Sequence, residues 1–332
     1  MRIAFVFNRK SGASPEQAEF DTPETIRAIH EALASGEHEV FDIEMSLGGS
    51  FSGWLRELAA RDPQIIFNTA EGFFGSARES VAPGIFEQLG LPYIGSGPHA
   101  CMVTMDKALT KRVVADEGVP VIEGRLVRKD DDLEKLGVGA AYPSFVKPNF
   151  EGSSKGISAR SICQSAGQLK ETCRALLGDF PEGVLVERYV PGRDLAVSFI
   201  GGVGNDGMLE PVEYSYADYQ DKAQTIYDDR LKSRGEGEVV VRCPAKIERP
   251  LRDKLHQMMR RIVRASGVVD FARADFRLAD SGEVYFLEIN ALPSLQPGAG
   301  LFEASKCLGL DYGQTILKIL EAGLRRHGFI EG

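Results

Sequence analysis

The chain lacks any apolar run long enough to cross a membrane. A membrane-spanning helix needs about 20 consecutive apolar residues, whereas the apolar residues here, 43% of the total, are interrupted throughout by charged side chains, which make up 26%. The apolar run near the N-terminus, residues 3–7 in MRIAFVFN, is also shorter than the roughly 7–15 residues of a signal-peptide core. We therefore expect a soluble protein with no membrane partner, in which this run forms a first buried strand.

The cysteines and histidines lack the spacings of a disulfide-rich or zinc-binding protein. The five histidines are scattered and show no HExxH motif. The five cysteines are odd in number, lie far apart and include no CxxC pair; they are Cys101, Cys163, Cys173, Cys243 and Cys307. Disulfide frameworks and zinc sites depend on such spacings. We therefore predict ordinary packing cysteines and a reducing, cytoplasmic location.

Positive charge is in deficit. The chain has 39 Lys and Arg against 48 Asp and Glu, for a formal net charge of −9. Binding to nucleic acid or to an anionic membrane surface is driven by clustered Lys and Arg. The charge balance therefore favours small-molecule ligands over nucleic acid.

The order of strand-like and helical segments predicts an α/β protein of several domains. At 332 residues, the chain exceeds a single ordinary core. Strand patterns at 2–8, 38–45 and 63–69 alternate with helical patterns at 22–35 and 81–90, as in a parallel sheet with crossover helices. We place domain boundaries at 1–102, 103–190 and 191–332, and we predict that the polar segment 214–238 is an ordered loop or lid.

A predicted hairpin near the C-terminus carries an unusual set of polar residues. The stretch FARADFRLADSGEVYFLEIN, residues 271–290, reads as two strands joined by a two-residue turn at Ser281-Gly282. That register places Asp275 opposite Glu288 and Arg273 opposite Asn290, all on one face. The other face then carries the core residues Ala274, Phe276, Leu278, Tyr285, Leu287 and Ile289.

Two carboxylates that face each other need a cation between them. Carboxylate and amide oxygens suit Mg²⁺, which binds one or two carboxylates and completes its shell with water and substrate phosphates. The hairpin therefore suggests a metal site at Asp275, Glu288 and Asn290. A solvated outer face, on which Arg273 and Arg277 balance the two acids, explains the same residues.

Upstream segments could supply phosphate and adenine contacts. Lys147, at the end of the strand SFVKP, could reach a phosphate as a point charge, and the turn NFEGSSKGIS could close over phosphates with backbone N–H groups, although no GxxxxGK[ST] motif is present. The strand VLVERYV breaks at PGRD, where Glu187 and Asp194 could bind an exocyclic amine and a ribose hydroxyl. A surface lysine, a flexible turn and an edge strand are the plain alternatives.

The order of these pieces resembles a known superfamily. MDKALTKR, VKPNFEGSSKG, VERYVPGRDLAV and ARADFRL…YFLEINALP, in this order, resemble the ATP-grasp superfamily and, more closely, the D-alanine:D-alanine ligases. The resemblance covers nearly the whole chain. It implies a three-domain ATP-grasp fold, α/β with α+β in part, whose N-terminal parallel-sheet domain is of the preATP-grasp type.

The resemblance also implies roles for particular residues. Arg273 matches the arginine that stabilises the anionic transition state, Ser153 a serine near the first substrate, and Glu19 the acid that holds the substrate ammonium. Asp275, Glu288 and Asn290 match the ligands of two Mg²⁺ ions, which Mn²⁺ could replace. The implied ATP-binding residues are Lys107, Lys147, Ser153, Ser154, Glu187, Arg188, Tyr189, Val190, Asp194 and Lys232.

The substrate half departs from the family pattern. Glu71, in FNTAEGFFG, stands near the family's histidine, Ser233 replaces the lid tyrosine, and Ala299 or Gly300 replaces the serine that holds the second amino acid's carboxylate. Polar residues after the third strand, Asn68 and Arg78 together with Glu71, could recognise different substrates, or could be surface charges on a loop.

We therefore predict an ADP-forming, ATP-dependent carboxylate–amine ligase acting through an acyl phosphate on amino-acid-like substrates. Two alternatives remain at this point: a genuine D-alanine:D-alanine ligase with a differently built acceptor site, and an ATP-binding protein or kinase that forms no amide bond. The resemblance further implies a homodimer.

Overall fold

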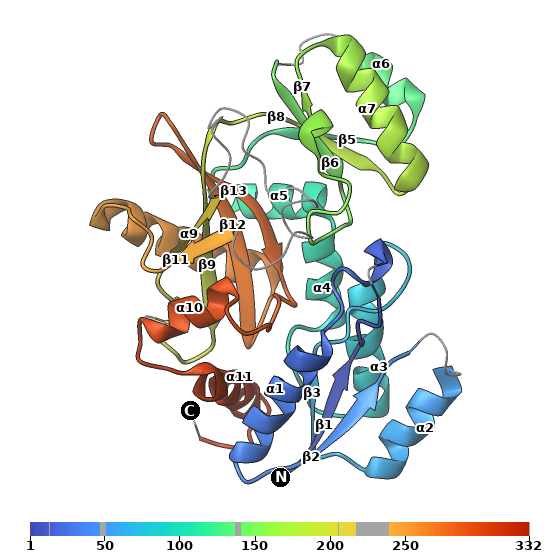
Figure 1. The fold of residues 1–332 in the computed structure, drawn as a ribbon, viewed down its shortest axis with the longest axis vertical. Helices are drawn as coiled ribbons and strands as arrows, with labels where there is room; N and C mark the ends of the chain where they lie inside the picture. The colour runs from blue at the N-terminus through green and yellow to red at the C-terminus, as the bar shows by residue number, and fades with distance from the viewer. Residues whose placement is uncertain (13, 47–50, 137–140, 205, 217–238, 332) are drawn as a thin grey trace.

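The computed structural model describes residues 1–12, 14–46, 51–136, 141–204, 206–216 and 239–331, and its β-strands form three sheets (Figure 1). The N-terminal sheet and its helices lie at the lower end of the view, together with both chain termini. The second sheet lies at the top, and the C-terminal sheet lies between them. Among the described residues, every helix is too short or too polar to span a membrane.

The N-terminal sheet is parallel, in the order β2-β1-β3-β4. Its strands are β1 (Arg2–Phe7), β2 (Glu39–Glu44), β3 (Ile65–Asn68) and β4 (Tyr93–Ile94). The connecting helices are α1 (Pro23–Ser35), α2 (Phe51–Arg61) and α3 (Val81–Leu89), with 3-10 turns η1 (Pro15–Gln17) and η2 (Arg78–Ser80). The predicted start of α1 is confirmed, because the Thr22 hydroxyl caps the helix by accepting from the Thr25 N–H.

Two helices lead from this sheet into the second one. They are α4 (Pro98–Met105) and α5 (Lys107–Asp116). The second sheet is antiparallel, in the order β5-β8-β6-β7. Its elements are β5 (Gly124–Val127), α6 (Asp130–Leu136), β6 (Ser144–Pro148), η3 (Ala159–Ser161), β7 (Ile162–Cys163), α7 (Ala166–Asp179) and β8 (Val184–Arg188).

The C-terminal sheet is antiparallel, in the order β11-β10-β9-β12-β13. Its strands are β9 (Gly192–Ile200), β10 (Val212–Tyr216), β11 (Val239–Arg242), β12 (Phe271–Ala279) and β13 (Val284–Asn290). The helices are α9 (Arg249–Ser266), α10 (Gly300–Lys306) and α11 (Tyr312–Arg326).

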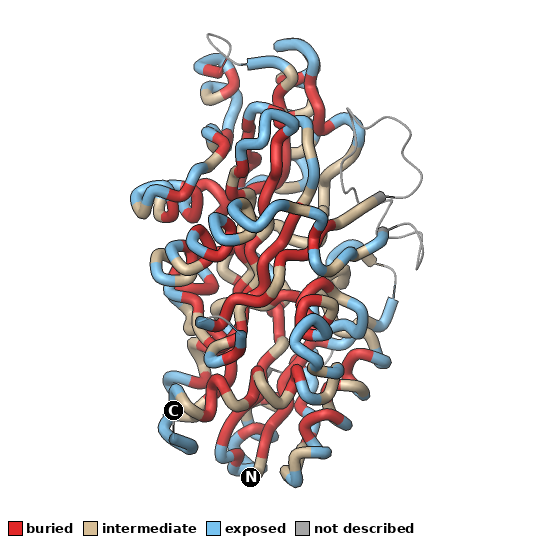
Figure 2. Tube along the Cα trace, turned by 90° about the vertical axis from the view of Figure 1, so that its left-hand side faces the viewer, coloured by how far each residue is buried: buried red, intermediate tan, exposed pale blue. Residues whose placement is uncertain are grey.

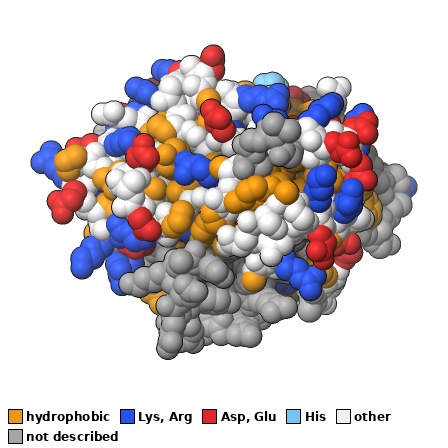
Figure 3. Space-filling view, turned by 90° about the horizontal axis from the view of Figure 1, so that it is seen from above, with side chains coloured by type: hydrophobic (Ala, Val, Ile, Leu, Met, Phe, Trp, Pro, Cys, Tyr) orange, Lys and Arg blue, Asp and Glu red, His pale blue; other side chains and the backbone are white. Residues whose placement is uncertain are grey.

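The apolar side chains that recur at the helical period of α9 form part of the core. The predicted stripe of α9 packs onto the sheet, with Leu255, Met258 and Ile262 buried and Leu251 and Val263 partly buried beside them. Figure 2 shows buried residues along the strands and exposed residues on the outer turns. On the face seen in Figure 3, basic and acidic side chains are interspersed over the described residues.

The predicted hairpin forms, but its turn differs from the prediction. Strand pairing starts one residue out of the expected register, with Leu278 opposite Val284 and Phe276 opposite Phe286. A β-bulge then restores the expected register beyond Phe276. The prediction of a two-residue turn at Ser281-Gly282 is therefore wrong, although the pairs at the polar cluster are correct.

The bulge also corrects the composition of the two faces. Val284 and Phe286 are buried in the core, where the sequence pattern placed Tyr285 and Leu287. Leu287 instead packs with Ile122 and Val190 and faces the cavity described below.

The packing prediction for the cysteines is confirmed for three of the five. Cys101, Cys163 and Cys173 are buried. Cys243 and Cys307 are partly or fully exposed, and their Sγ atoms lie 2.8 Å apart.

One buried acid joins the first sheet to the last helix. Asp270, just before β12, accepts hydrogen bonds from the Gly95 N–H at 2.8 Å and from Arg326 Nε at 2.9 Å and Nη2 at 2.7 Å. Because Gly95 follows β4 and Arg326 ends α11, this carboxylate holds together segments that are 175 and 56 residues distant from it in the sequence.

Replacing Asp270 by Ala should destabilise the protein by about 2–3 kcal/mol, since it leaves Arg326 and the Gly95 N–H without this partner. The figure is below that of a fully buried pair because the Arg326 side chain is 30% exposed. Thermal unfolding followed by circular dichroism should show a midpoint lowered by roughly 4–6 °C. The control Asp253→Ala, at an exposed ion pair with Arg249, should change it little.

Candidate active site

A cavity of ≈ 1060 Å³ is lined by strands of the second and C-terminal sheets and, from the first domain, by residues of loops, 3-10 turns and helix α1. It brings together every described residue that was assigned a catalytic, ATP-binding or metal-binding role: Glu19, Lys107, Lys147, Ser153, Ser154, Glu187, Arg188, Tyr189, Val190, Asp194, Arg273, Asp275, Glu288 and Asn290. The predicted residues Lys232 and Ser233 lie outside the described residues, as do residues 217–238 of the predicted lid. The prediction of a loop is wrong for the first residues of that segment, 214–216, which belong to strand β10 and pair with β9 and β11.

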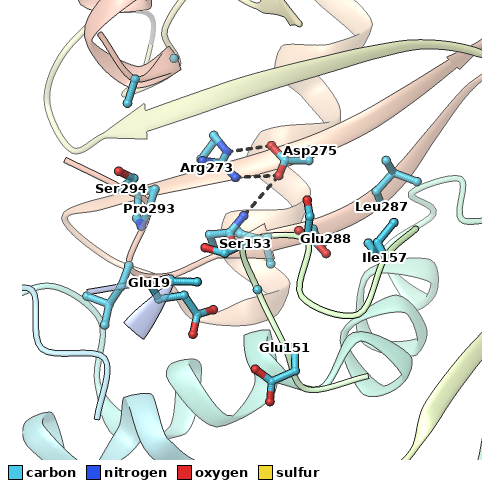
Figure 4. Close-up of a pocket in the computed structure, with 18 of the residues that line it drawn as sticks. Glu19, Glu151, Ser153, Ile157, Arg273, Asp275, Leu287, Glu288, Pro293 and Ser294 are labelled. Carbon is cyan, nitrogen blue, oxygen red and sulfur yellow. Dashed lines mark hydrogen bonds and ion pairs between the residues drawn. The ribbon is translucent and has the colours of Figure 1, made fainter. Parts of the chain in front are cut away.

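The polar face of β12 and β13 forms the floor of this cavity (Figure 4). Arg273 donates two hydrogen bonds to Asp275, from Nε at 2.8 Å and from Nη2 at 2.9 Å. Asn290 donates to the same carboxylate at 3.3 Å, and Glu288 lies 3.3 Å from the ammonium of Lys107. The two acids predicted to face each other are therefore each paired with a different cation.

Burial and charge act in opposite directions on these acids. Burial raises the pKa of Asp275, and Arg273 offsets only part of this rise. Burial also raises the pKa of Glu288, but Lys107 and then Lys147 outweigh it and hold the pKa below its ordinary value. A carboxylate held ionised and an amide oxygen beside it are hard donors of the kind that Mg²⁺ binds together with phosphates.

A second buried acid is clamped by two lysines. Glu187, on β8, pairs with Lys147 of β6 at 3.3 Å and with Lys111 of α5. Its carboxylate is therefore engaged by these two lysines, and its backbone lies within the sheet, opposite Gly124 of β5 and Phe145 of β6. The sequence interpretation missed Lys111, although it stands four residues after Lys107, on the same face of a helix.

The turn after β6 has a strained backbone. Ser153 and Ser154 both have positive φ angles, 54° and 60°, which residues other than Gly rarely adopt. Gly152 precedes them, and a Cβ there would lie 2.3 Å from the Glu19 carboxylate. The turn therefore passes close to the first domain, and both serines line the cavity.

An apolar slot lies beside the break between β8 and β9. Ile122, Val190 and Leu287 pack together there. Asp194 is held at this edge by Arg277, whose Nη1 lies 2.7 Å from its carboxylate. Arg277 therefore pairs with Asp194 rather than balancing Asp275 and Glu288. An apolar slot with a carboxylate at its edge suits a base and a ribose.

The first domain and the turn after β6 together supply a dense group of charges at the far end of the cavity. Glu19 is paired with Arg78 at 2.9 Å and with Lys155 at 2.8 Å. Together they lower the pKa of Glu19 to about 2, against burial, which raises it. Glu71 lines the cavity, whereas Asn68 does not and accepts instead from the Ala70 N–H.

The acceptor end differs from the family pattern in a way that the packing explains. A Cβ on Gly300 would lie 2.5 Å from the Tyr214 hydroxyl, so the tyrosine occupies the room of a side chain at this position. Tyr214, on β10, also lines the cavity. The sequence interpretation missed Tyr214, because no local pattern links it to residue 300.

Comparisons with known proteins identify the family and the fold. A family profile described as "D-ala D-ala ligase C-terminus" matches residues 113–321. A D-alanine–D-alanine ligase of Caulobacter vibrioides is 32% identical over 81% of this chain and 79% of its own. Two solved structures share the fold: a D-alanine–D-alanine ligase of Bacillus anthracis complexed with ATP, with 22% identity, full coverage of both chains and a TM-score of 0.73, and a D-Ala:D-Ser ligase of Enterococcus faecalis, with 18% identity, coverage of 97% and 99%, and a TM-score of 0.76.

The fold and the cavity therefore define an ATP-dependent, ADP-forming ligase of the ATP-grasp superfamily. Within it, the chain belongs to the D-alanine–D-alanine ligase family.

Replacing Glu288 by Gln should lower substrate-stimulated ADP release at least about 100-fold, because it removes the negative charge that faces Lys107 and the predicted metal. The matched control is Glu283→Gln, at an exposed position of the same hairpin, and it should keep wild-type turnover. Thermal midpoints within about 2 °C of the wild type would show that both variants fold. Full activity of folded Glu288→Gln would remove Glu288 from the site.

Proposed function

We propose that this protein joins an amino-acid-like carboxylate to an amine, and that its substrates differ from two D-alanines. The observation that carries the proposal is the contrast within one cavity. Lys107, Lys147, Arg273, Asp275 and Glu288 converge at one end. The substrate end departs from the family pattern. Glu71 stands near the position of the family's histidine, and the Tyr214 hydroxyl occupies the room of a side chain at residue 300.

The chemistry follows from the weakness of a carboxylate as an acyl donor. The substrate carboxylate attacks the γ-phosphate of ATP and becomes an acyl phosphate, while ADP leaves. Lys107 and Lys147 bind the phosphates as point charges. Asp275, Glu288 and Asn290 would hold Mg²⁺, which spreads the phosphate charge when it is bound.

The amine then attacks the acyl phosphate, and inorganic phosphate leaves. Arg273 stabilises the tetrahedral oxyanion, since its guanidinium is fixed by Asp275 on a rigid strand and does not need to reorganise. The turn at 150–158 would exclude water and so protect the acyl phosphate from hydrolysis.

Two other functions remain to be tested. A genuine D-alanine–D-alanine ligase would need Tyr214 or a neighbour to replace the missing serine hydroxyl. An ATP-binding protein or a kinase would have no need of Arg273 beside the carboxylate cluster. The homodimer, the cytoplasmic location, the domain boundaries and the second metal ion stay predictions.

The proposal predicts ADP release and a new amide product with amino-acid pairs other than two D-alanines. Purified protein is incubated with ATP and Mg²⁺ across single and paired D- and L-amino acids and small amines, with mass detection of products. A product formed with D-alanine alone would establish the first alternative. ADP release without an amide would indicate a kinase, and no stimulation by any compound would indicate a binding protein.

A further inference from the structure

The charges at the first-domain end of the cavity form one closed group. Glu19 and Glu151 share the same two cations, Arg78 and Lys155. Glu151 lies 3.4 Å from Arg78 and 3.2 Å from Lys155, and Glu19 contacts both within 2.9 Å. Two acids and two bases thus neutralise one another, and this group has no positive charge to spare for a neighbour.

Three further carboxylates line the cavity on this side, and one of them, Asp21, accepts a hydrogen bond from the Thr69 hydroxyl. The other two are Glu71 and Glu79. Glu71 follows β3 and is 9% exposed, and Glu79 lies in η2. Among the described residues, neither side chain has a hydrogen bond or an ion pair. Burial, followed by the negative charge of neighbouring acids, raises the pKa of Glu71 well above its usual value and that of Glu79 to about 7.

The backbone holds Glu71 in this costly position. Gly72 has a positive φ of 75°, and its N–H donates to Asn8 at 2.9 Å. A Cβ on Gly72 would lie 2.4 Å from the Arg78 carbonyl, so only glycine lets the two segments pack this closely. The fold therefore keeps a buried, unpaired carboxylate at the cavity wall.

We propose that Glu71 and Glu79 bind cationic groups of the acid substrate, and that this substrate is a diamino acid. A buried carboxylate is costly unless a cation accompanies it. Glu19 is already neutralised by its own ion pairs. Burial favours the protonated forms of Glu71 and Glu79, which would release a proton to solvent and ionise against an arriving cation, and two such acids match two ammonium groups. The inference rests on the proposed function, because it names the substrate of that same site.

Pairs of amino acids whose side chains have the same length but differ in charge separate the effect of charge from the effect of size. Ornithine and norleucine have side chains of equal length that end in ammonium and methyl, and 2,4-diaminobutyrate and norvaline form a shorter pair. We expect kcat/KM for ADP release to be at least 10-fold higher for the charged member of a pair, in the D or the L series, with glycine or alanine as the amine. Glu71→Gln and Glu79→Gln should each reduce this preference at least 10-fold.

The control Glu31→Gln removes an exposed acid from α1 and should leave the preference unchanged. Turnover with equal or greater activity for the neutral members would overturn the subsite and leave the ligase function standing. If no compound stimulates turnover, the proposed function fails, and calorimetry with the same pairs still tests the subsite. Tighter binding of ornithine than of norleucine, lost in Glu71→Gln, would support it, and equal binding would overturn it.

A separate observation concerns Cys243 and Cys307. Cys243 follows β11 and Cys307 follows α10, and their Sγ atoms lie 2.8 Å apart although the residues are 64 positions apart in the chain. Cys307 is exposed, whereas Cys101, Cys163 and Cys173 are buried. Burial and the neighbouring sulfur raise the pKa of Cys243.

The geometry points to a reversible disulfide between Cys243 and Cys307. With oxidised glutathione as the oxidant, the Cys307 thiolate attacks one sulfur and releases glutathione thiolate. Cys243 then loses its proton and attacks Cys307, releasing the second glutathione thiolate, so that two protein thiols are oxidised and one glutathione disulfide is reduced. The new bond would join β11 to α10, which contribute Val241 and Gly300 to the cavity wall.

Thiol titration of the denatured protein after oxidation should count three thiols instead of five, and dithiothreitol should restore five. Peptide mapping should recover one linked pair, Cys243 with Cys307. In Cys243→Ser and Cys307→Ser the internal link should be absent. Five free thiols after oxidation, a link to another cysteine, or glutathione retained on Cys307 in the wild type would overturn the assignment.

Discussion

The site depends on the two-residue period of one strand, β12. This strand pairs with β9 along its whole length and with β13 on its other side, so its side chains cannot rotate between faces. One face carries Ala272, Ala274 and Phe276 into the core against α9. The other presents Arg273 and Asp275 to the cavity. If the pairing register of β12 shifted by one residue, its apolar side chains would face the cavity and its charged side chains would face the core. The packing that stabilises this sheet therefore also places its charges.

Charge compensation then organises the cavity around that strand. Each of the acids Asp275, Glu288 and Glu187 is paired with a cation from the same cavity. These pairs keep Lys107 and Lys147 extended toward the site before a nucleotide is present, so phosphates would meet cations already in place. The same rule makes Glu71 and Glu79 informative, because they are the acids of this wall that the described residues leave unpaired.

Much of the ATP side could be predicted from local sequence. The spacing of Arg273 and Asp275 on one strand, and of Glu288 and Asn290 on the next, requires each pair to share a face. The turn type could not be derived in the same way. Ser281-Gly282 is compatible with more than one hairpin loop, and the bulge near Leu287 depends on packing against Ile122 and Val190, which come from distant segments.

The sequence by itself determined the order of strands and helices, the helix cap at Thr22, the apolar stripe of α9 and the polar face of the hairpin. Each of these follows from interactions within a few residues or between two adjacent strands. Only the tertiary structure decided which charges pair, since Glu19 meets Arg78 across 59 residues and Lys155 across 136. It also placed the Tyr214 hydroxyl against Gly300 and Cys243 beside Cys307. Such contacts depend on how whole sheets pack together, and no local pattern in the sequence predicts them.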